Sequence, residues 1–195
     1  MQEKANVSLS AFELQLVTEP GWILTKTQII AKVYALFGDV SKMYQHHQHM
    51  EQLPALVTTL APKISKGENY EGLPYVMLDY PRCFDKDDVF AVRSFFWWGH
   101  YFSCTLHLKG MYKQQYEQRI DAAIKNNELN GWFLNATDEE WNHDVQESMQ
   151  LIHTDAAMFS NNILKITAVH PLQEWNASFA FYENSINKLM KIIVD

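Results

Sequence analysis

The chain has 195 residues, of which 47% are apolar, and it contains 11 Phe, 9 Tyr and 6 Trp but only 7 Gly. This composition excludes disordered, collagen-like and low-complexity proteins, and the length predicts a single domain over residues 1–195. The net charge is −7 and the lysines are scattered, so we expect no nucleic-acid partner. We also expect no membrane partner and a cytoplasmic location, because the sequence lacks both a run of about 18 apolar residues and a signal peptide.

Capping boxes mark the predicted helices of the first third of the chain. A capping box over Ser10–Glu13 predicts a short helix over residues 11–18. A second box at Thr25–Gln28 precedes apolar residues that recur at spacings of three and four, which predicts a long amphipathic helix reaching about residue 51. Residues 63–72 are mostly polar, and we interpret them as a connection.

An aromatic-rich region follows, and its periodicity is that of extended chain. Residues 75–79 predict a short strand, and residues 80–88 the loop after it. Two runs of aromatic and β-branched residues, 89–98 and 101–108, predict a hairpin with Gly99-His100 as a two-residue turn. This register sets Trp98 opposite Tyr101 and Val92 opposite His107. Both faces are largely apolar, so we expect both to be covered.

The last third alternates between helical and extended patterns. We predict a helix over residues 111–125, a short strand over 131–134, a strand over 163–170 and a closing helix after Pro171. A third capping box at Thr137–Glu140 predicts another helix, with the apolar stripe Trp141, Val145, Met149 and Ile152. The predicted fold class is α+β: an antiparallel sheet of three to five strands with an aromatic hairpin, packed by two long amphipathic helices and shorter helices.

Two segments suggest a family. Residues 73–82 (LPYVMLDYPR) and 95–103 (FFWWGHYFS) resemble an uncharacterised bacterial protein family of unknown function. The order of the predicted elements from residue 26 onward also resembles the YktB-like α+β fold, although Trp97-Trp98-Gly99-His100 has no counterpart in that pattern. The resemblance implies a fold and carries no functional residue over to this chain.

Motifs for cofactors and metals are weak. No G-x-G occurs, and Leu73 stands where a P-loop needs lysine, so we predict no nucleotide or other cofactor. His46 and His49 could share a metal ion on one flank of the long helix, but a third ligand is lacking and we predict no metal site. Glu140 and His143 match one half of a di-iron motif, and we predict a solvated helix surface for His143.

The aromatic hairpin holds the strongest candidate site. Arg93 lies in a strand among apolar neighbours, so a buried guanidinium must be paired with one of the nearby aspartates. We favour a structural ion pair; the alternative is that Arg82 or Arg93 binds the carboxylate or phosphate of a small anionic ligand between aromatic walls. The candidate ligand-binding residues are Asp79, Tyr80, Arg82, Arg93, Trp97, Trp98, His100 and Tyr101.

Two functional hypotheses remain. The favoured one is a non-catalytic domain that binds a small ligand, or that interacts through its aromatic sheet with a partner or with itself as a homo-oligomer. The alternative is an enzyme whose acid–base groups come from Asp79, Tyr80, His100 and His107, or from a His-bound metal near the same sheet. The sequence favours the first hypothesis, because no nucleophile–base pair can be assembled from it.

Overall fold

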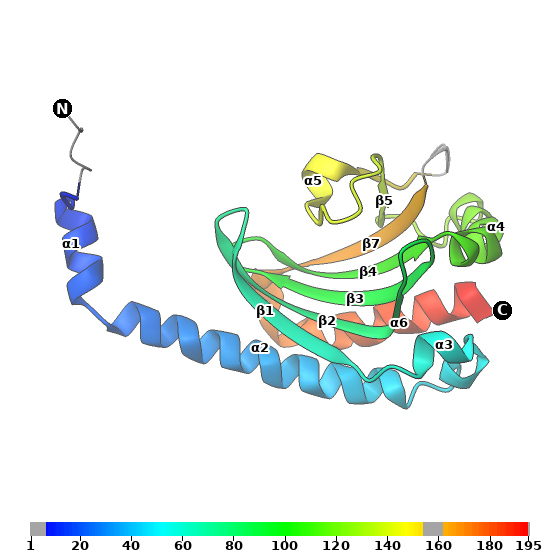
Figure 1. Ribbon diagram of the computed structural model, residues 1–195, viewed down its shortest axis with the longest axis horizontal. Helices are drawn as coiled ribbons and strands as arrows, with labels where there is room; N and C mark the ends of the chain where they lie inside the picture. The colour runs from blue at the N-terminus through cyan, green and yellow to red at the C-terminus, as the bar shows by residue number, and fades with distance from the viewer. Residues whose placement is uncertain (1–6, 154–161, 195) are drawn as a thin grey trace.

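One curved seven-stranded antiparallel sheet organises the computed structural model, which describes residues 7–153 and 162–194 (Figure 1). The strand order is β1-β2-β3-β4-β7-β5-β6. This confirms the α+β class and corrects the expected number of three to five strands. The strands are β1 Lys63–Tyr70, β2 Leu73–Phe84, β3 Val89–Trp97, β4 Tyr101–Lys109, β5 Phe133–Asn135, β6 Met149–Leu151 and β7 Ile163–Pro171.

Helices α2 and α6 run along one face of this sheet, and α4 packs at one end (Figure 1). Short 3₁₀ helices lie at Met50–Gln52 and Leu172–Ala177. The α-helices are α1 Ala11–Thr18, α2 Gly21–Gln45, α3 Ala55–Thr58, α4 Met111–Lys125, α5 Val145–Ser148 and α6 Ser178–Val194. The predicted ranges of α1 and α4 are confirmed, including the capping box of Ser10 and Glu13.

Helix α2 begins and ends earlier than predicted. Pro20 forms its N-cap, and the hydroxyl of Thr25 donates to the carbonyl of Gly21 inside the helix instead of capping it. The helix ends at Gln45, after which the chain turns so that Met50 and Leu53 reach the core. The apolar spacing thus predicted the helix correctly, whereas the capping box at Thr25 did not mark its start.

The face of the sheet that meets the helices is the hydrophobic core. Alternate residues of β3 and β4 point into it, as the period of two in a strand requires. Tyr44 of α2 reaches across this core to Ser94, with 3.1 Å between the hydroxyls, and the hydroxyl of Tyr182 in α6 donates to the carbonyl of Phe95 at 3.0 Å. The strand residues in the core include Val76, Leu78, Tyr80, Phe90, Val92, Phe96, Phe102, Cys104, Leu106, Leu108, Leu164, Ile166 and Ala168.

The register of the aromatic hairpin differs by one residue from the prediction. Phe96 pairs with Phe102, so the loop comprises three residues, with Gly99 at φ +78°. A three-residue hairpin loop needs one residue in the left-handed region, which glycine adopts without strain. The shift moves each β4 residue to the other face relative to β3, and it brings His107 to the same face as Arg93.

Strand β1 occupies the segment that was predicted as a connection, and β2 contains the predicted strand over residues 75–79 but extends into the predicted loop. β1 is an edge strand with exposed lysines at residues 63 and 66 and a register shift between Gly67 and Tyr70. An edge strand of this kind is polar, which explains why residues 63–72 lack the apolar alternation of a buried strand. β2 continues to Phe84, beyond the predicted end at residue 79, with a register shift between Asp79 and Arg82.

The second face of the sheet is covered by residues 136–148, which we call the covering segment. The predicted helix beginning at residue 137 is wrong, because only the four residues of α5 are helical. The hydroxyl of Thr137 accepts from the backbone N–H of Glu139 at 3.4 Å, so the predicted capping box is a local turn. Side chains of this segment bind the sheet instead of forming one face of a helix, and α5 lies over that face in Figure 1.

Gly110 is required where β4 meets α4. Its φ is +59°, and a Cβ placed there would lie 2.1 Å from Oδ1 of Asp88 and 2.3 Å from the carbonyl oxygen of Asp87. The same Asp88 oxygen accepts from the backbone N–H of Met111 at 2.7 Å, so the β2–β3 loop caps α4.

Gly110→Ala is therefore expected to lower the free energy of unfolding by about 2 kcal/mol or more, through backbone strain and the displaced cap. Gly38→Ala is the matched control, because a Cβ at this position in α2 would meet nothing within 4 Å. It should raise stability by about 0.5–1 kcal/mol. Urea unfolding of both variants tests this; equal effects would contradict it.

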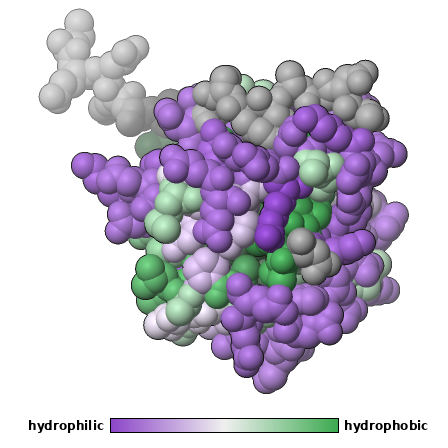
Figure 2. All heavy atoms as spheres, turned by 90° about the vertical axis from the view of Figure 1, so that its right-hand side faces the viewer, coloured by the Kyte–Doolittle hydropathy of each residue, from purple (hydrophilic) through white to green (hydrophobic). Residues whose placement is uncertain are grey.

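The two ends of the molecule differ in surface character. The end that carries α4 and the C-terminal turn of α6 is mainly hydrophilic, with a smaller group of apolar side chains near its middle (Figure 2). Helix α1 projects from the opposite end (Figure 1). Among the described residues, no helix is both long enough and apolar enough to cross a membrane.

Candidate functional site

A cluster of charged side chains lies on the second face of the sheet. The register places Arg93 opposite Thr105 and Thr105 opposite Thr167 in one row across three strands. In the next row, Ala91 lies opposite His107 and His107 opposite Lys165. The covering segment adds a carboxylate and an imidazole from above. We call this group the buried charge cluster: Asp79, Arg93, His107, Lys109, Glu140, His143 and Lys165.

Arg93 is fully engaged by protein groups. Its Nε and Nη2 donate to the two carboxylate oxygens of Asp79 at 2.7 and 3.0 Å, and both residues are buried. Its Nη1 lies 2.9 Å from Nε2 of His143. A guanidinium can only donate, so Nε2 of His143 accepts and this ring is neutral, with its proton on Nδ1. Burial, with the adjacent charge of Arg93, holds the pKa of His143 well below its usual range.

The other half of the cluster centres on His107. Glu140 reaches down from the covering segment, with Oε2 3.1 Å from Nζ of Lys109 and Oε1 3.5 Å from Nε2 of His107. Nζ of Lys165 donates to the main-chain carbonyls of Glu140 and Asn142. Burial, reinforced by the positive charge of Lys165, lowers the pKa of His107 to about 3, and burial lowers that of Lys165 to about 8.

Two tyrosines hold the covering segment by its backbone. The hydroxyl of Tyr101 donates to the carbonyl of His143 at 3.0 Å and accepts from the N–H of Val145 at 3.1 Å. The hydroxyl of Tyr70 accepts from the N–H of His143 at 2.7 Å. Burial raises the pKa of both phenols, so both stay protonated and can bridge in this way.

The predicted site residues are divided among several places. Asp79, Arg93 and Tyr101 lie in or beside the buried charge cluster. Trp97 is buried at the end of the hairpin, where the exposed ring of His100 stacks on it at 3.5 Å between centroids. Nε of Arg82 donates to the carbonyl of Ala61 at 3.0 Å, and Tyr80 belongs to the helix-facing core. The acid–base groups proposed for an enzyme, Asp79, Tyr80, His100 and His107, therefore do not meet at one point.

The histidine pair predicted as a weak metal candidate lies just beyond α2. Nδ1 of His46 bonds to the carbonyl of Lys42 at 2.7 Å, and the ring nitrogens of His49 lie 3.1 Å from the amide groups of Gln48 and Gln52. Among the residues described, no group of three or more His, Cys, Asp or Glu side chains is placed to hold a metal ion.

Comparison with known proteins gives no assignment. No family model, curated protein or solved structure matches the chain. The family resemblance of residues 73–82 and 95–103 thus stays a prediction. What the site does has to be inferred from its own geometry.

Trp98 lines a different feature, one of two neighbouring grooves along the first half of α2. Both grooves include Lys26 and Glu68, which form an ion pair between α2 and β1. The Trp98 groove has a volume of about 530 Å³ and is lined by Trp22, Thr25, Lys26, Ile29, Glu68, Gly72, Leu73, Pro74 and Trp98. The Tyr34 groove has a volume of about 720 Å³ and is lined by Ile23, Lys26, Thr27, Ile30, Ala31, Tyr34, Lys66 and Glu68.

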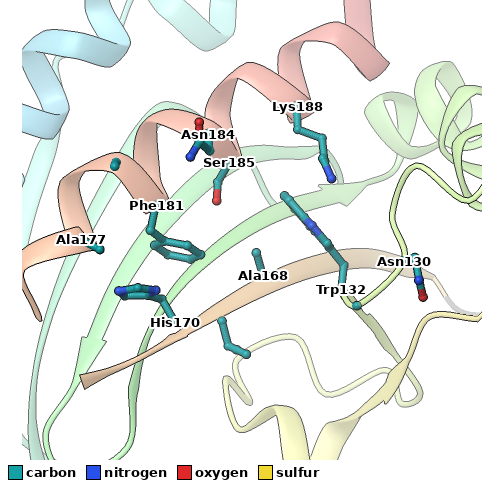
Figure 3. Close-up of a pocket in the computed structure, with 12 residues that line it drawn as sticks. Asn130, Trp132, Ala168, His170, Ala177, Phe181, Asn184, Ser185 and Lys188 are labelled. Carbon is teal, nitrogen blue, oxygen red and sulfur yellow. The ribbon is translucent and has the colours of Figure 1, made fainter. Parts of the chain in front are cut away.

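A third hollow of about 430 Å³ lies between β7 and α6 (Figure 3). The rings of His170 and Phe181 stack in it at 5.0 Å, and Lys188 lies over the ring of Trp132. Its two ionisable side chains bond to main-chain carbonyls, His170 to Glu174 and Lys188 to Glu128. This hollow therefore has aromatic and polar walls without an acid–base pair.

Sequence reasoning missed several members of these sites. Lys109, Lys165 and Glu140 were not considered as a group, because they come from three elements that only the sheet register brings together. His143 was predicted to be solvated, but it contacts Arg93. A correct hairpin register would have set Arg93 and His107 on one face.

Proposed function

We propose that this protein is a non-catalytic interaction domain that associates with a second copy of itself through its N-terminal helix. The observation that carries the proposal is that α1 has no buried residue although half of it is large and apolar. Phe12 is 67% exposed and Val17 is 70% exposed. Exposed apolar patches of this kind mark interaction surfaces in folded proteins.

The apolar surface continues from α1 into α2. The indole N–H of Trp22 donates to the carbonyl of Leu16 at 2.7 Å, which fixes the angle between the two helices. Helix α1 therefore projects from the body of the molecule, and we call this helix with its flanking residues 7–20 the arm (Figure 1). The exposed apolar side chains over this stretch are Val7, Leu9, Phe12, Leu14, Val17, Trp22, Ile23 and Leu24.

The Trp98 groove supplies a complementary surface. It combines apolar walls, including Ile29, Leu73 and Trp98, with the ammonium group of Lys26. The arm carries carboxylates at Glu13 and Glu19 and no lysine or arginine. Because Lys26 is already paired with Glu68 inside the groove, the match between arm and groove rests on their apolar side chains.

Arm and groove lie at the same end of the molecule, which suits a twofold dimer. If the arm of one copy occupies the groove of the other, the second arm occupies the first groove by symmetry, and the assembly closes. Burying a large apolar side chain contributes about 1.5–3 kcal/mol, and each dimer buries two arms. A second copy of the chain is therefore the partner that would bury both the arm and the Trp98 groove.

Sedimentation velocity over low to high micromolar concentrations tests this proposal. We expect the wild-type protein to shift from monomer to dimer, and Phe12→Asp to stay monomeric at the top concentration because a charge replaces the apolar contact. Leu56→Asp is the matched control: Leu56 is 68% exposed but lies on α3, so this variant should dimerise like the wild type.

A complementation experiment distinguishes the arm–groove pairing from non-specific association through exposed apolar side chains. Ile29→Asp damages the groove and leaves the arm intact, whereas Phe12→Asp does the reverse. An equimolar mixture retains one intact arm–groove pair per heterodimer, so it should associate more strongly than either variant alone. A wild-type protein that stays monomeric throughout, or a mixture that behaves as its components, would refute the proposal.

A further inference from the structure

The buried charge cluster contains an anion that does not belong to the sheet. Glu140 comes from the covering segment, and its carboxylate lies against Lys109 and His107 of β4. Its own backbone carbonyl accepts from Nζ of Lys165 at 3.2 Å. The sheet thus presents basic groups, and the covering segment supplies a carboxylate that binds Lys109 and lies near His107.

The charges of the cluster leave this part of the sheet positive without Glu140. Asp79 neutralises Arg93 through two hydrogen bonds, and both histidines are neutral at pH 7. The negative charge that balances Lys109 and Lys165 then comes from Glu140 and, for Lys165, also from Glu139. Removal of the Glu140 carboxylate would leave the partly exposed ammonium group of Lys109 without its ion-pair partner. The buried ammonium group of Lys165 would keep its main-chain carbonyls but lose a nearby negative charge, and an anion at this place would stabilise both groups.

His107 provides an independent sign that a ligand position exists here. His107 is only 3% exposed, and its Nε2 atom has no hydrogen-bond partner among the described residues. A buried ring nitrogen without a partner is rare in folded proteins, and one explanation is a ligand that bonds to it. Glu140 approaches this atom to 3.5 Å without forming a bond.

We propose that Lys109, Lys165 and His107 form a binding site for a small carboxylate, and that Glu140 is its internal ligand. A free carboxylate that replaces Glu140 would accept from the ammonium groups and from Nε2–H of His107. The covering segment, whose longest helix has four residues, would then lose one of its anchors to the sheet. This site lies on the sheet, and it does not depend on the proposed dimer.

Chemical rescue of Glu140→Ala by acetate tests the site. The variant removes the internal carboxylate and leaves space for an external one, so we expect its melting temperature to fall by about 3–6 °C. Acetate should restore more than half of this loss in a saturable way, whereas sodium chloride at equal ionic strength should not. Glu140→Gln keeps the side-chain volume and should not be rescued.

The identity of the site is tested by a second substitution and a second anion. Lys109→Met in the Glu140→Ala background should abolish the acetate response, because the ammonium group that holds Glu140 is gone. Inorganic phosphate is the competing anion. A response to phosphate or chloride as large as that to acetate, or rescue that survives Lys109→Met, would overturn the proposal.

If Glu140→Ala does not fold, the wild-type protein can still be used to test the carboxylate site. Acetate well above the millimolar effective concentration of a tethered group should compete with Glu140. Hydrogen exchange should then become faster in residues 137–148 and stay unchanged in α4. The indole of Trp141, 6.0 Å from the ring of His107, should report the same change by fluorescence. Unchanged exchange in residues 137–148 would overturn the proposal.

Discussion

Replacing Arg93 with methionine is expected to lower the free energy of unfolding by about 3–5 kcal/mol. The guanidinium is 6% exposed and provides both hydrogen bonds to the carboxylate of Asp79, which is 5% exposed. Without Arg93 this buried carboxylate has lost its counter-charge, and the imidazole of His143 has lost its donor. Urea unfolding, followed by tryptophan fluorescence, measures the loss.

Two comparisons show whether the loss comes from the buried pair. Arg82→Met is the matched control: this partly exposed arginine donates to a single carbonyl, that of Ala61, and its removal should cost less than about 1 kcal/mol. Asp79→Leu combined with Arg93→Met removes both charges and should recover much of the stability lost in the single variant. A single variant as stable as the wild type would contradict this assignment.

Acidification from pH 7 to pH 5 is expected to destabilise the fold through its neutral histidines. The pKa of His107 is lowered from about 6.5 in the unfolded chain to about 3 in the folded protein. The unfolded state therefore takes up a proton in this range and the folded state does not. The stability contribution is complete above pH 6.5 and decreases as the pH falls toward 3, by about 2 kcal/mol for His107 at pH 5. The lowered pKa of His143 acts in the same direction.

His107→Gln isolates this effect. The variant should lose less stability than the wild type between pH 7 and pH 5, because one group that takes up a proton on unfolding has been removed. His153→Gln removes an exposed histidine and serves as the control. Urea midpoints measured across the pH range give the slopes. Parallel slopes for the wild type and His107→Gln would show that this imidazole is not held neutral by the fold.

Local signals predicted the helices well and the strands less well. The limits of α1 and α4 follow from a capping box and from apolar spacing, which act within a few residues. The edge strand β1 was missed, since a strand with little burial has no apolar alternation. The third capping box failed for the opposite reason: its signal is local, but Glu140 and His143 gain more from the sheet than from a helix.

The candidate site was less predictable than the fold, because it depends on register. Several nearby aspartates could pair with Arg93 on sequence grounds, and the pairing of β2 with β3 selects Asp79. A one-residue difference in the hairpin loop separated His107 from Arg93 in the prediction. Cross-strand neighbours of this kind can be predicted only when the length of the hairpin loop is known. A loop that is one residue longer or shorter moves every later side chain of the second strand to the opposite face of the sheet.

The two edge strands of the sheet limit how copies of this chain can associate. β1, at one edge, carries exposed lysines and an irregular register, and β6, at the other, is three residues long. Such edges resist the addition of further strands. At high concentration, two molecules are therefore expected to associate reversibly through side chains. They are not expected to extend the sheet through backbone hydrogen bonds between edge strands. These two edges thus disfavour fibril formation although α1 exposes large apolar side chains.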